Sequence, residues 1–305
     1  MNKGKRAKRQ SNYRLYVLCI VPVALIFIFN YLPMVGAIIA FKDYRIKDGI
    51  FGSKWVGLRN FDLFFRSKDF ANIAWNTIYL NFIFIIVGTI CSVLFAILLF
   101  NVRSRRNVKV YQTISITPYF ISWVVAGYVA YAFLNPSYGF LNQALKALGL
   151  NKVDVYSQPK VWPLILTIAN VWKNVGMDSV IYYAALVGID TTLFEAADVD
   201  GVNKIQKAWY ITLPMLIHLI TIMTILKIGN IFRADFGLFY QLTRDVGQLY
   251  STTDVMDTYI YRTLRIWNDF SLSSAAGLLQ SVVGFVLVIL TNTITKKIDS
   301  ESALF

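Results

Sequence analysis

Charged side chains are scarce in this sequence. They make up 15% of the 305 residues, whereas a soluble globular domain carries about 25%, and hydrophobic residues make up 56%. A soluble protein of this length needs many charged side chains on its surface, and this sequence does not supply them. The composition therefore excludes an ordinary soluble domain and predicts an all-α integral membrane protein.

Cysteine and histidine are also rare. The two cysteines, Cys19 and Cys91, both fall inside apolar segments, and His218 is the one histidine. Two such cysteines predict neither a disulfide framework nor a metal site. The sequence has no GxxxxGK[ST] phosphate-binding loop, so we expect the chain to bind no ATP in that manner and no metal or other cofactor of its own.

Long apolar segments are present instead. A helix needs about 20 mostly apolar residues to cross the hydrocarbon core of a bilayer. Six segments are candidates: Leu15–Phe41, Ile73–Phe100, Val110–Leu134, Val161–Val187, Ile211–Asn230 and Ala275–Thr295. The first is too long for the apolar core of a signal peptide, so we expect it to be retained. We predict six transmembrane helices.

Basic residues predict the orientation of these helices. A tail, residues 1–14, and the short loop after the second segment carry Lys and Arg but no acid, which is typical of cytoplasmic segments. Six crossings return the C-terminus, with Lys296 and Lys297, to the cytoplasm. The net charge of +13 is mainly this topology signal. We expect the bilayer as a partner and no nucleic acid, because the basic residues flank spans and are not interleaved with exposed aromatic residues.

A polar stretch, residues 190–210, interrupts the apolar chain between the fourth and fifth segments. Thr192 followed by Glu195 predicts a capping box that starts a short helix near Leu193. Asp200-Gly201 predicts the end of that helix, because glycine tolerates the left-handed conformation of a helix C-terminus. A second capping box, Asn203 with Gln206, predicts the helix that enters the membrane.

This predicted helix pair has a shape suited to docking. Leu193, Ala196 and Ala197 form a small apolar face, with acidic residues beside it. The local motif alone is equally consistent with a capping residue and a turn that serve no partner.

The wider pattern distinguishes the two interpretations. Glu195-Ala196-Ala197, then Asp200-Gly201, then Ile211 and Leu213-Pro214 closely resemble the EAA loop of permease subunits of ATP-binding-cassette (ABC) importers, whose signature is EAA---DG---------I-LP. Val202 stands where many members have alanine.

Other segments resemble one branch of these permeases. Thr117–Trp123, Thr253–Arg262 and Ala276–Leu278 look like the LplB-type branch of the sugar class, which serves complex oligosaccharides. The likeness covers about residues 70–297. One departure is Leu242-Thr243-Arg244-Asp245-Val246, where the general sugar-permease pattern reads LTGGP.

The resemblance implies a type I ABC importer (MetI-like) permease fold in a bacterial cell membrane, with residues 15–305 as one transmembrane domain. It implies a second permease subunit, two ATPase subunits that use ATP and Mg²⁺, an extracytoplasmic sugar-binding protein and an oligosaccharide substrate. Sugar systems commonly pair two different permeases, so we expect a heterodimer, although the sequence leaves a homodimer open.

The resemblance also assigns roles within the loop. The loop would be a coupling helix in a groove of the ATPase, with Glu195 facing a basic residue there. Ala196 and Ala197 would keep the helix thin, and Asp200-Gly201 would form the turn toward the fifth span. Leu213 and Pro214 would set the angle at which that span enters the membrane.

The fourth segment supplies the main candidates for the substrate pathway. Asn170, Asn174 and Asp178 recur every four residues, and Lys173 lies about 60° to one side, so one arc of the helix is polar at mid-membrane depth. Each ion would cost about 2.5–3.5 kcal/mol facing lipid. We expect them to face protein or a water-filled cavity, either as pathway residues or as a buried structural pair. The resemblance includes the Asn-x-Trp element, Asn170 to Trp172, with Asn170 as a hydroxyl-binding residue.

Several further polar residues are weaker candidates. Tyr119 and Ser122 follow Pro118 in the third segment, and the fifth ends in a polar run. The remaining candidates are Asn76, Tyr79, Asn81, Lys227, Asn230, Arg233 and Asp235. His218 is better explained by packing than by proton transfer.

Two other functions remain open from the sequence. A membrane-embedded enzyme acting on lipid-linked sugars would need clustered carboxylates or histidines at one membrane face, whereas the acids here concentrate in the 190–210 loop. An ion-coupled secondary transporter would use Lys173 and Asp178 but would leave the EAA-like loop without a purpose. Small residues of the sixth segment, Ser273, Gly277, Ser281 and Gly284, form a face that permits close approach of another helix.

Overall fold

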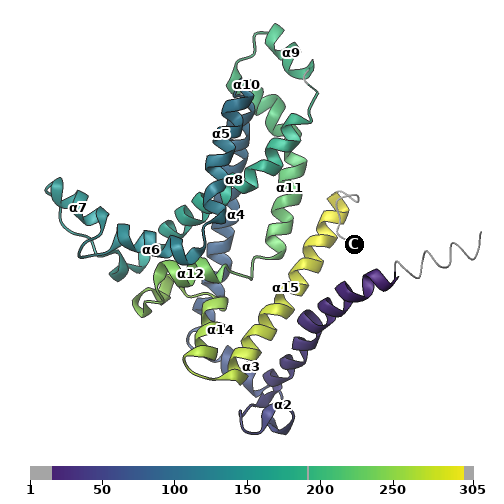
Figure 1. The fold of residues 1–305 in the computed structure, drawn as a ribbon, viewed down its shortest axis with the longest axis vertical. Helices are drawn as coiled ribbons and strands as arrows, with labels where there is room; N and C mark the ends of the chain where they lie inside the picture. The colour runs from purple at the N-terminus through teal and green to yellow at the C-terminus, as the bar shows by residue number, and fades with distance from the viewer. Residues whose placement is uncertain (1–15, 191, 299–305) are drawn as a thin grey trace, which may run out of the picture. The chain divides into compact units, whose positions relative to one another are not determined.

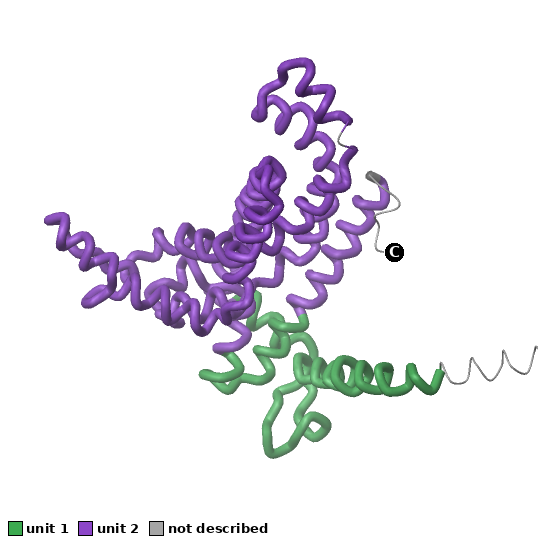
Figure 2. Tube along the Cα trace, turned by 45° about the horizontal axis from the view of Figure 1, so that its top comes forward, with its two compact units in different colours: residues 1–66, 263–278 green, residues 67–262, 279–305 purple. Residues whose placement is uncertain are grey.

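The structure is a computed structural model that describes residues 16–190 and 192–298. This part of the chain is helical apart from one two-stranded sheet (Figure 1). It divides into two compact units, residues 1–66 with 263–278 and residues 67–262 with 279–305 (Figure 2). The predicted basic tail, residues 1–14, lies outside the described residues.

The elements follow one another along the chain with short connections. A first helix spans Tyr16–Phe41. The others are β1 (Lys42–Asp43), α2 (Gly49–Gly52), β2 (Lys54–Trp55), α3 (Arg59–Phe65), α4 (Phe70–Phe100), α5 (Arg105–Ile116), η3 (Thr117–Phe120), α6 (Trp123–Leu134), α7 (Phe140–Ala147), η4 (Val155–Ser157), η5 (Pro159–Val161), α8 (Trp162–Val187), α9 (Thr192–Val199), α10 (Lys204–Lys207), η6 (Ala208–Thr212), α11 (Leu213–Gly229), α12 (Phe236–Thr243), η7 (Gly247–Leu249), α13 (Tyr250–Thr253), α14 (Met256–Arg265) and α15 (Phe270–Ile298).

Within the described residues the predicted apolar segments are mostly helical, with a break at Ile121 and Ser122 in the third. Four described helices are long and apolar enough to cross a membrane: Tyr16–Phe41, Phe70–Phe100, Lys204–Gly229 and Phe270–Lys297. The number rises to six if Arg105–Phe120 with Trp123–Leu134, and Pro159–Val187 with Thr192–Val199, each count as one bent span. The all-helical, multi-pass class is therefore confirmed, with between four and six spans.

The third predicted span is not one straight helix. The chain bends by 96° between Phe120 and Trp123. Pro118 stands at the start of the short helix η3, and Ile121 is extended. The hydroxyl of Ser122 then caps α6 by accepting the N–H of Val125 at 3.3 Å. A uniform apolar composition predicted a continuous helix here, whereas a new N-cap starts a second one in another direction.

The first unit is built around a hairpin that follows the first helix. Strand β1 pairs antiparallel with β2, with Lys42 opposite Trp55. The buried amide of Asn60 donates to the carbonyl oxygens of Ala40 at 2.8 Å and Lys42 at 2.9 Å. Phe41 stacks on Trp55, with ring centroids 5.5 Å apart. One amide thus ties α3 to the point where the first helix becomes a strand.

The second unit has α4 and α8 at its centre, packed along much of their lengths. One apolar cluster lies where they meet α12, and it includes Leu80, Phe84, Trp162, Leu166, Leu238 and Phe239. A second lies nearer α11 and includes Val93, Ala96, Tyr182, Leu186 and Leu216. The two clusters pack α8 against α4, α11 and α12.

Gly176 lets α5 approach α8 closely. A Cβ atom at this position would lie 1.9 Å from the carbonyl oxygen of Ser115, a distance no substitution could tolerate without moving the backbone. Small residues at helix crossings are typical of membrane proteins, where close backbone packing drives association.

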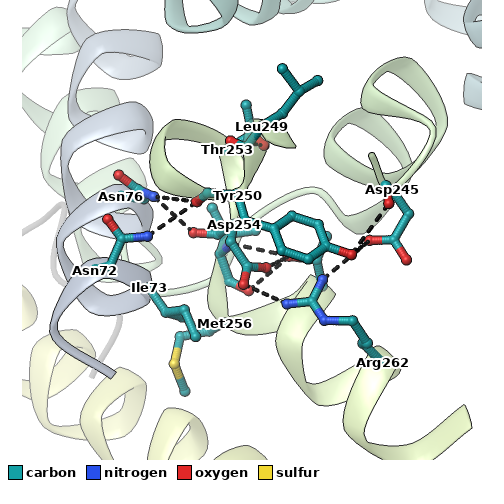
Figure 3. Close-up of polar contacts among 12 residues, drawn as sticks. Asn72, Ile73, Asn76, Asp245, Leu249, Tyr250, Thr253, Asp254, Met256 and Arg262 are labelled. Carbon is teal, nitrogen blue, oxygen red and sulfur yellow. Dashed lines mark hydrogen bonds and ion pairs between the residues drawn. The ribbon is translucent and has the colours of Figure 1, made fainter. Parts of the chain in front are cut away.

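A buried polar network joins α14 to the segment before it (Figure 3). The Arg262 guanidinium pairs with the carboxylates of Asp245, at 3.1 Å, and Asp254, and its side chain is 7% exposed. Asp254 also accepts the hydroxyl of Thr258 at 2.8 Å. Burial raises the pKa of Asp254, and the Arg262 charge counteracts that rise.

The same network is attached to α4. The amide of Asn76 donates to the Asp254 carbonyl at 3.2 Å, and that of Asn72 to the Tyr250 carbonyl at 3.1 Å. The Met256 N–H donates to the Thr77 hydroxyl at 3.0 Å. Asn76, a candidate for the substrate pathway from sequence, is 5% exposed and lies in this network.

Replacing Arg262 should destabilise the protein strongly. Arg262→Met leaves two carboxylates without their cation, one of them deeply buried, so we expect a loss of about 3–5 kcal/mol in the free energy of unfolding. Thermal or denaturant unfolding of the purified protein in detergent measures it. The matched control is Arg66→Met, which breaks an exposed ion pair with Asp62 and should cost less than about 1 kcal/mol. Equal stability of the two variants would contradict the conclusion that the ion pairs of Arg262 stabilise the fold.

Candidate functional site

The turn between α9 and α10 ends the first helix as the sequence predicts. Gly201 has a φ of +74°. The N–H of Val202 donates to the Ala197 carbonyl at 3.0 Å, and the N–H of Gly201 donates to the Asp198 carbonyl at 3.2 Å. These bonds form a Schellman motif, which satisfies the last carbonyl groups of the helix and fixes the direction of the chain that follows.

The second predicted capping box is confirmed. The Asn203 side chain accepts the N–H of Gln206 at 2.9 Å, and the Gln206 side chain accepts the N–H of Asn203 at 3.0 Å. The helix that begins at Lys204 then runs without interruption to Gly229. The turn of this helix pair is therefore built into the base of the predicted fifth span.

The start of α9 differs from the prediction. Thr192 is the first residue of the helix, not the residue before it, and its N–H donates to the Asp190 carboxylate at 3.0 Å. These hydrogen bonds from Thr192 hold the pKa of Asp190 below its ordinary value. The carboxylate two residues upstream thus takes the acceptor role that the sequence assigned to the Thr192 hydroxyl.

Two contacts connect α9 to α4 and α10. The Phe194 ring packs against Phe100 at the end of α4, with centroids 5.2 Å apart. Lys207, on α10, forms an ion pair with Asp198 and reaches the Phe194 carbonyl at 3.5 Å. The sequence did not predict either contact, because the partners lie in other helices and no local spacing marks them.

The outer face of α9 carries the residues of the EAA-like pattern. Glu195 and Ala196 are exposed, and so is Leu193, whereas Ala197 is 6% exposed. The small apolar face predicted from spacing is therefore split, with Ala197 turned inward. In Figure 1, α9 and α10 lie at one end of α4, α5 and α11, so Glu195 and Ala196 are available to a partner there.

A cavity of about 450 Å³ lies between α4, α8 and α11 in the second unit. Its apolar wall includes Phe84, Ile85, Val171, Val175, Met223 and Leu226. Its polar side chains are Asn81, Asn170, Asn174, Asp178, Lys227, Asn230 and Arg233. A mostly apolar pocket with a few converging polar groups is typical of a small-molecule site.

Asp178 and Lys227 face each other in this cavity. Their ion pair has an oxygen-to-nitrogen distance of 2.6 Å, and the two side chains are 32% and 34% exposed. The sequence left open a buried structural pair between helices, and in the structure Asp178 on α8 pairs with Lys227 on α11. The amide of Asn174 donates to the backbone carbonyl of Asn170 at 3.1 Å. The side-chain amide of Asn170 lines the cavity and forms no hydrogen bond within residues 16–190 and 192–298.

Lys173 forms hydrogen bonds with the backbone at the bend of the third span. Its ammonium group donates to the carbonyl oxygens of Pro118 at 3.3 Å, Tyr119 at 2.9 Å and Ile121. It also lies 5.1 Å from the centre of the Trp123 ring. Carbonyl groups at the end of a helix carry partial negative charge, so a cation there is favourable. Lys173 therefore satisfies backbone groups that the bend would otherwise leave without donors.

The other sequence candidates lie outside the cavity lining. Trp172 is 47% exposed and Tyr119 is 43% exposed. Asp235 caps α12 by accepting the N–H of Gly237 at 3.0 Å, and it accepts the indole N–H of Trp123 at 2.5 Å. The cavity thus brings together Asn170, Asn174, Asp178, Lys227 and Asn230, and it adds Asn81 and Arg233 from the weaker candidates.

Among residues 16–190 and 192–298 there is no group of three or more His, Cys, Asp or Glu side chains placed to hold a metal ion. The polar groups of the cavity are amides, one carboxylate and two cations. Such a set can donate and accept hydrogen bonds to hydroxyl groups.

Comparisons with known proteins link this geometry to a family. No protein-family model matches the chain. Protein LplB of Bacillus subtilis (strain 168) is 32% identical over 287 residues, which are 94% of this chain and 90% of LplB. The polygalacturonan/rhamnogalacturonan transport system permease protein YteP of the same strain is 32% identical over 292 residues, which are 96% of this chain and 90% of YteP.

Two solved structures share the fold over nearly the whole chain. One is a bacterial ABC transporter involved in the import of the acidic polysaccharide alginate, with a TM-score of 0.86, 31% identity, and coverage of 97% of this chain and 100% of the other. The second is a bacterial alginate ABC transporter in complex with an alginate pentasaccharide-bound periplasmic protein, with a TM-score of 0.84, 32% identity and 98% coverage of both chains.

Replacing Lys173 should loosen the bend of the third span. Lys173→Met removes the donor of three carbonyl groups, and we expect a loss of at least about 2 kcal/mol in the free energy of unfolding. Unfolding of the purified protein in detergent measures it. Lys160→Met, at an exposed lysine just before α8, is the matched control and should change stability little. If both variants unfold alike, Lys173 does not hold the bend.

Proposed function

Because this chain belongs to the permease subunits of ABC importers for sugars, we propose that it forms part of the membrane path by which an oligosaccharide enters a bacterial cell. The chain is a transporter subunit and not an enzyme, and it is a multi-pass membrane protein. The observation that carries the proposal is the cavity between α4, α8 and α11, because amides and ions converge there within otherwise apolar helices.

The polar groups of the cavity suit a sugar. Hydroxyl groups donate and accept hydrogen bonds, and amide side chains can do both at once. The Asn170 amide has no hydrogen-bond partner among the described residues, so it can bind a hydroxyl without first giving up a bond within the protein. Asn174 and Asn230 line the same cavity, and Asp178 and Lys227 can exchange part of their mutual pairing for substrate hydroxyls.

The complete topology is six transmembrane helices of the type I importer, MetI-like fold, with both termini in the cytoplasm. Six crossings result if Arg105–Phe120 with Trp123–Leu134 counts as one bent span and α8 as another, beside the four long helices. The basic residues of segment 1–14 and of the loop after α4 support the orientation. It follows that α9 and α10 are on the cytoplasmic side and that segments 42–72, 135–160 and 231–274 are on the external side.

The helix α9 is the coupling helix that docks on an ATPase subunit. Exposed Glu195 and Ala196 support this role. The loop is connected to all three walls of the cavity: α8 leads into α9, Phe194 contacts α4 through Phe100, and the Gly201 turn with Lys207 leads through Leu213 and Pro214 into α11. A movement of α9 is therefore transmitted to the side chains that line the cavity.

The complete transporter contains further subunits beside this chain. Two ATPase subunits use ATP and Mg²⁺, and this chain binds no cofactor. An extracytoplasmic binding protein delivers the sugar, as the alginate transporter complex with its periplasmic protein supports. A second, different permease completes the path. Open space around Gly284 on α15 supports close approach of a helix at this position.

Reversing the charge of Glu195 should uncouple transport. Glu195→Lys places a cation opposite the basic groove expected on the ATPase, so we expect the uptake of labelled oligosaccharide to fall at least about tenfold. The neutral variant Glu195→Gln should lower uptake by a smaller factor. Uptake by cells, normalised to the amount of permease in the membrane, measures it. The control Asp62→Lys reverses an exposed acid outside the loop. Unchanged uptake with Glu195→Lys would leave Glu195 without a role in coupling.

Removing the Asn170 amide should slow translocation. Asn170→Ala deletes one hydrogen bond to a substrate hydroxyl, and we expect the maximal uptake rate to fall about three- to tenfold. Asn101→Ala is the matched control, because the Asn101 amide lies at the end of α4 and donates to the Ile97 carbonyl outside the cavity. Equal uptake rates for the two variants would exclude Asn170 from the path.

A further inference from the structure

The chain between α11 and α12, residues 230–235, is an irregular segment with Arg233 near its centre. Backbone groups outside a helix need other hydrogen-bond partners. Around Arg233 these partners are side chains of three different helices. The first is Asn81 on α4, whose amide donates to the carbonyl oxygen of Arg233 at 3.3 Å.

The residues on either side of Arg233 are held in the same way. The amide of Gln280, on α15, donates to the Phe232 carbonyl at 3.0 Å. The carboxylate of Asp257, on α14, accepts the N–H of Ala234 at 2.8 Å. Phe232 and Ala234 are both 7% exposed. Three consecutive residues of the segment are therefore fixed by side chains that lie far from them in the sequence.

Gln280 and Asp257 also bind each other. The Nε2 atom of Gln280 donates to Oδ2 of Asp257 at 2.9 Å, so its two N–H groups serve the Phe232 carbonyl and this carboxylate. Burial raises the pKa of Asp257, and the hydrogen bonds from Ala234 and Gln280 counteract that rise. Gln280 and Asp257 thus form one clamp on the backbone around Arg233.

The side chain that this clamp places is exposed and lines the cavity between α4, α8 and α11. Within residues 16–190 and 192–298 the Arg233 guanidinium forms no ion pair and no hydrogen bond. Lys227, the other cation of this cavity, is paired with Asp178. Arg233 therefore presents up to five unengaged N–H donors in a planar arrangement, and these can bind neighbouring hydroxyl oxygens of a sugar.

We infer that Gln280 is a positioning residue for transport: together with Asp257 it fixes the backbone around Arg233, so that the guanidinium is placed to bind sugar hydroxyl groups in the cavity. Gln280 acts through Arg233, because the wall of this cavity is formed by α4, α8, α11 and the segment after α11. A binding group whose backbone is already fixed loses less freedom when it engages a ligand. The inference rests on the proposed function and connects α14 and α15 to the substrate path.

Gln280→Met tests the inference, because methionine keeps the length of the side chain but removes both N–H donors. The probe is whichever of labelled trigalacturonate, an alginate trisaccharide and maltotriose enters cells with the native transporter fastest. We expect the maximal uptake rate, normalised to the assembled permease, to fall about fivefold in Gln280→Met. The matched control is Gln143→Met, which loses a bond to the Tyr138 carbonyl on α7 and should transport normally.

A double-mutant cycle shows whether Gln280 acts through Arg233. Arg233→Met alone should lower the uptake rate about tenfold, because it removes hydrogen bonds from a charged donor. Adding Gln280→Met to Arg233→Met should then cost less than a further twofold. A further fivefold loss would overturn the inference, since Gln280 would then act independently of Arg233.

Thiol labelling measures the position of the segment without transport. Ala234→Cys is introduced into a transporter in which Cys19 and Cys91 of this chain are replaced by alanine, and the purified complex reacts with N-ethylmaleimide. Gln280→Met should raise the labelling rate at least about threefold. Ala126→Cys is the matched control, because Ala126 is also 7% exposed but lies on α6, and its labelling rate should not change.

An unchanged labelling rate at Ala234→Cys would overturn the inference, and so would an equal rise at Ala126→Cys, which would indicate general loosening of the fold. The labelling result decides if uptake by the Arg233→Met variants falls below detection. Unchanged uptake in Gln280→Met, beside measurable native uptake, would overturn the inference but leave the proposed function intact. If the native transporter carries none of the three sugars, the proposed function itself fails.

Discussion

Backbone groups in a membrane must find their hydrogen-bond partners within the protein, because lipid supplies none. This constraint decides how the helices of this chain are broken. At the bend between η3 and α6, the ammonium group of Lys173 satisfies three carbonyl groups. In the irregular segment before α12, the Asn81 amide donates to the carbonyl groups of Ile231 and Arg233. Each break is thus stable because a polar side chain on a neighbouring helix completes it.

The same constraint produces the cavity. Polar side chains placed on α4, α8 and α11 cannot face lipid without a large cost, so they turn toward one another and leave a polar interior. Asp178 and Lys227 neutralise each other there, and the side-chain amide of Asn170 forms no hydrogen bond within the part of the chain that the structure describes. The ion pair that stabilises the helix bundle and the amides that we propose to contact a substrate therefore line the same cavity, and a movement of the helices changes both.

Different kinds of interaction stabilise the two ends of the second unit. At the α9 end, the interactions are mostly local: a Schellman turn at Gly201 and a capping box at Asn203 connect α9 to the long apolar helix that begins at Lys204. At the α12–α14 end, a buried network around Arg262 holds a turn that its own residues disfavour. Local sequence motifs suffice for the first arrangement, whereas the second depends on side chains that are distant along the chain.

The sequence by itself determined the membrane class, the apolar segments and the helix pair at residues 190–210, because length of an apolar run and capping chemistry are local properties. It also placed Asn170, Asn174 and Asp178 on one arc of α8. Only the tertiary structure decided the partners of the ions: Asp178 pairs with Lys227, 49 residues away, and Lys173 binds carbonyl groups more than 50 residues away. Such pairings depend on how each helix is rotated against its neighbours, and no periodicity within a single helix contains that rotation.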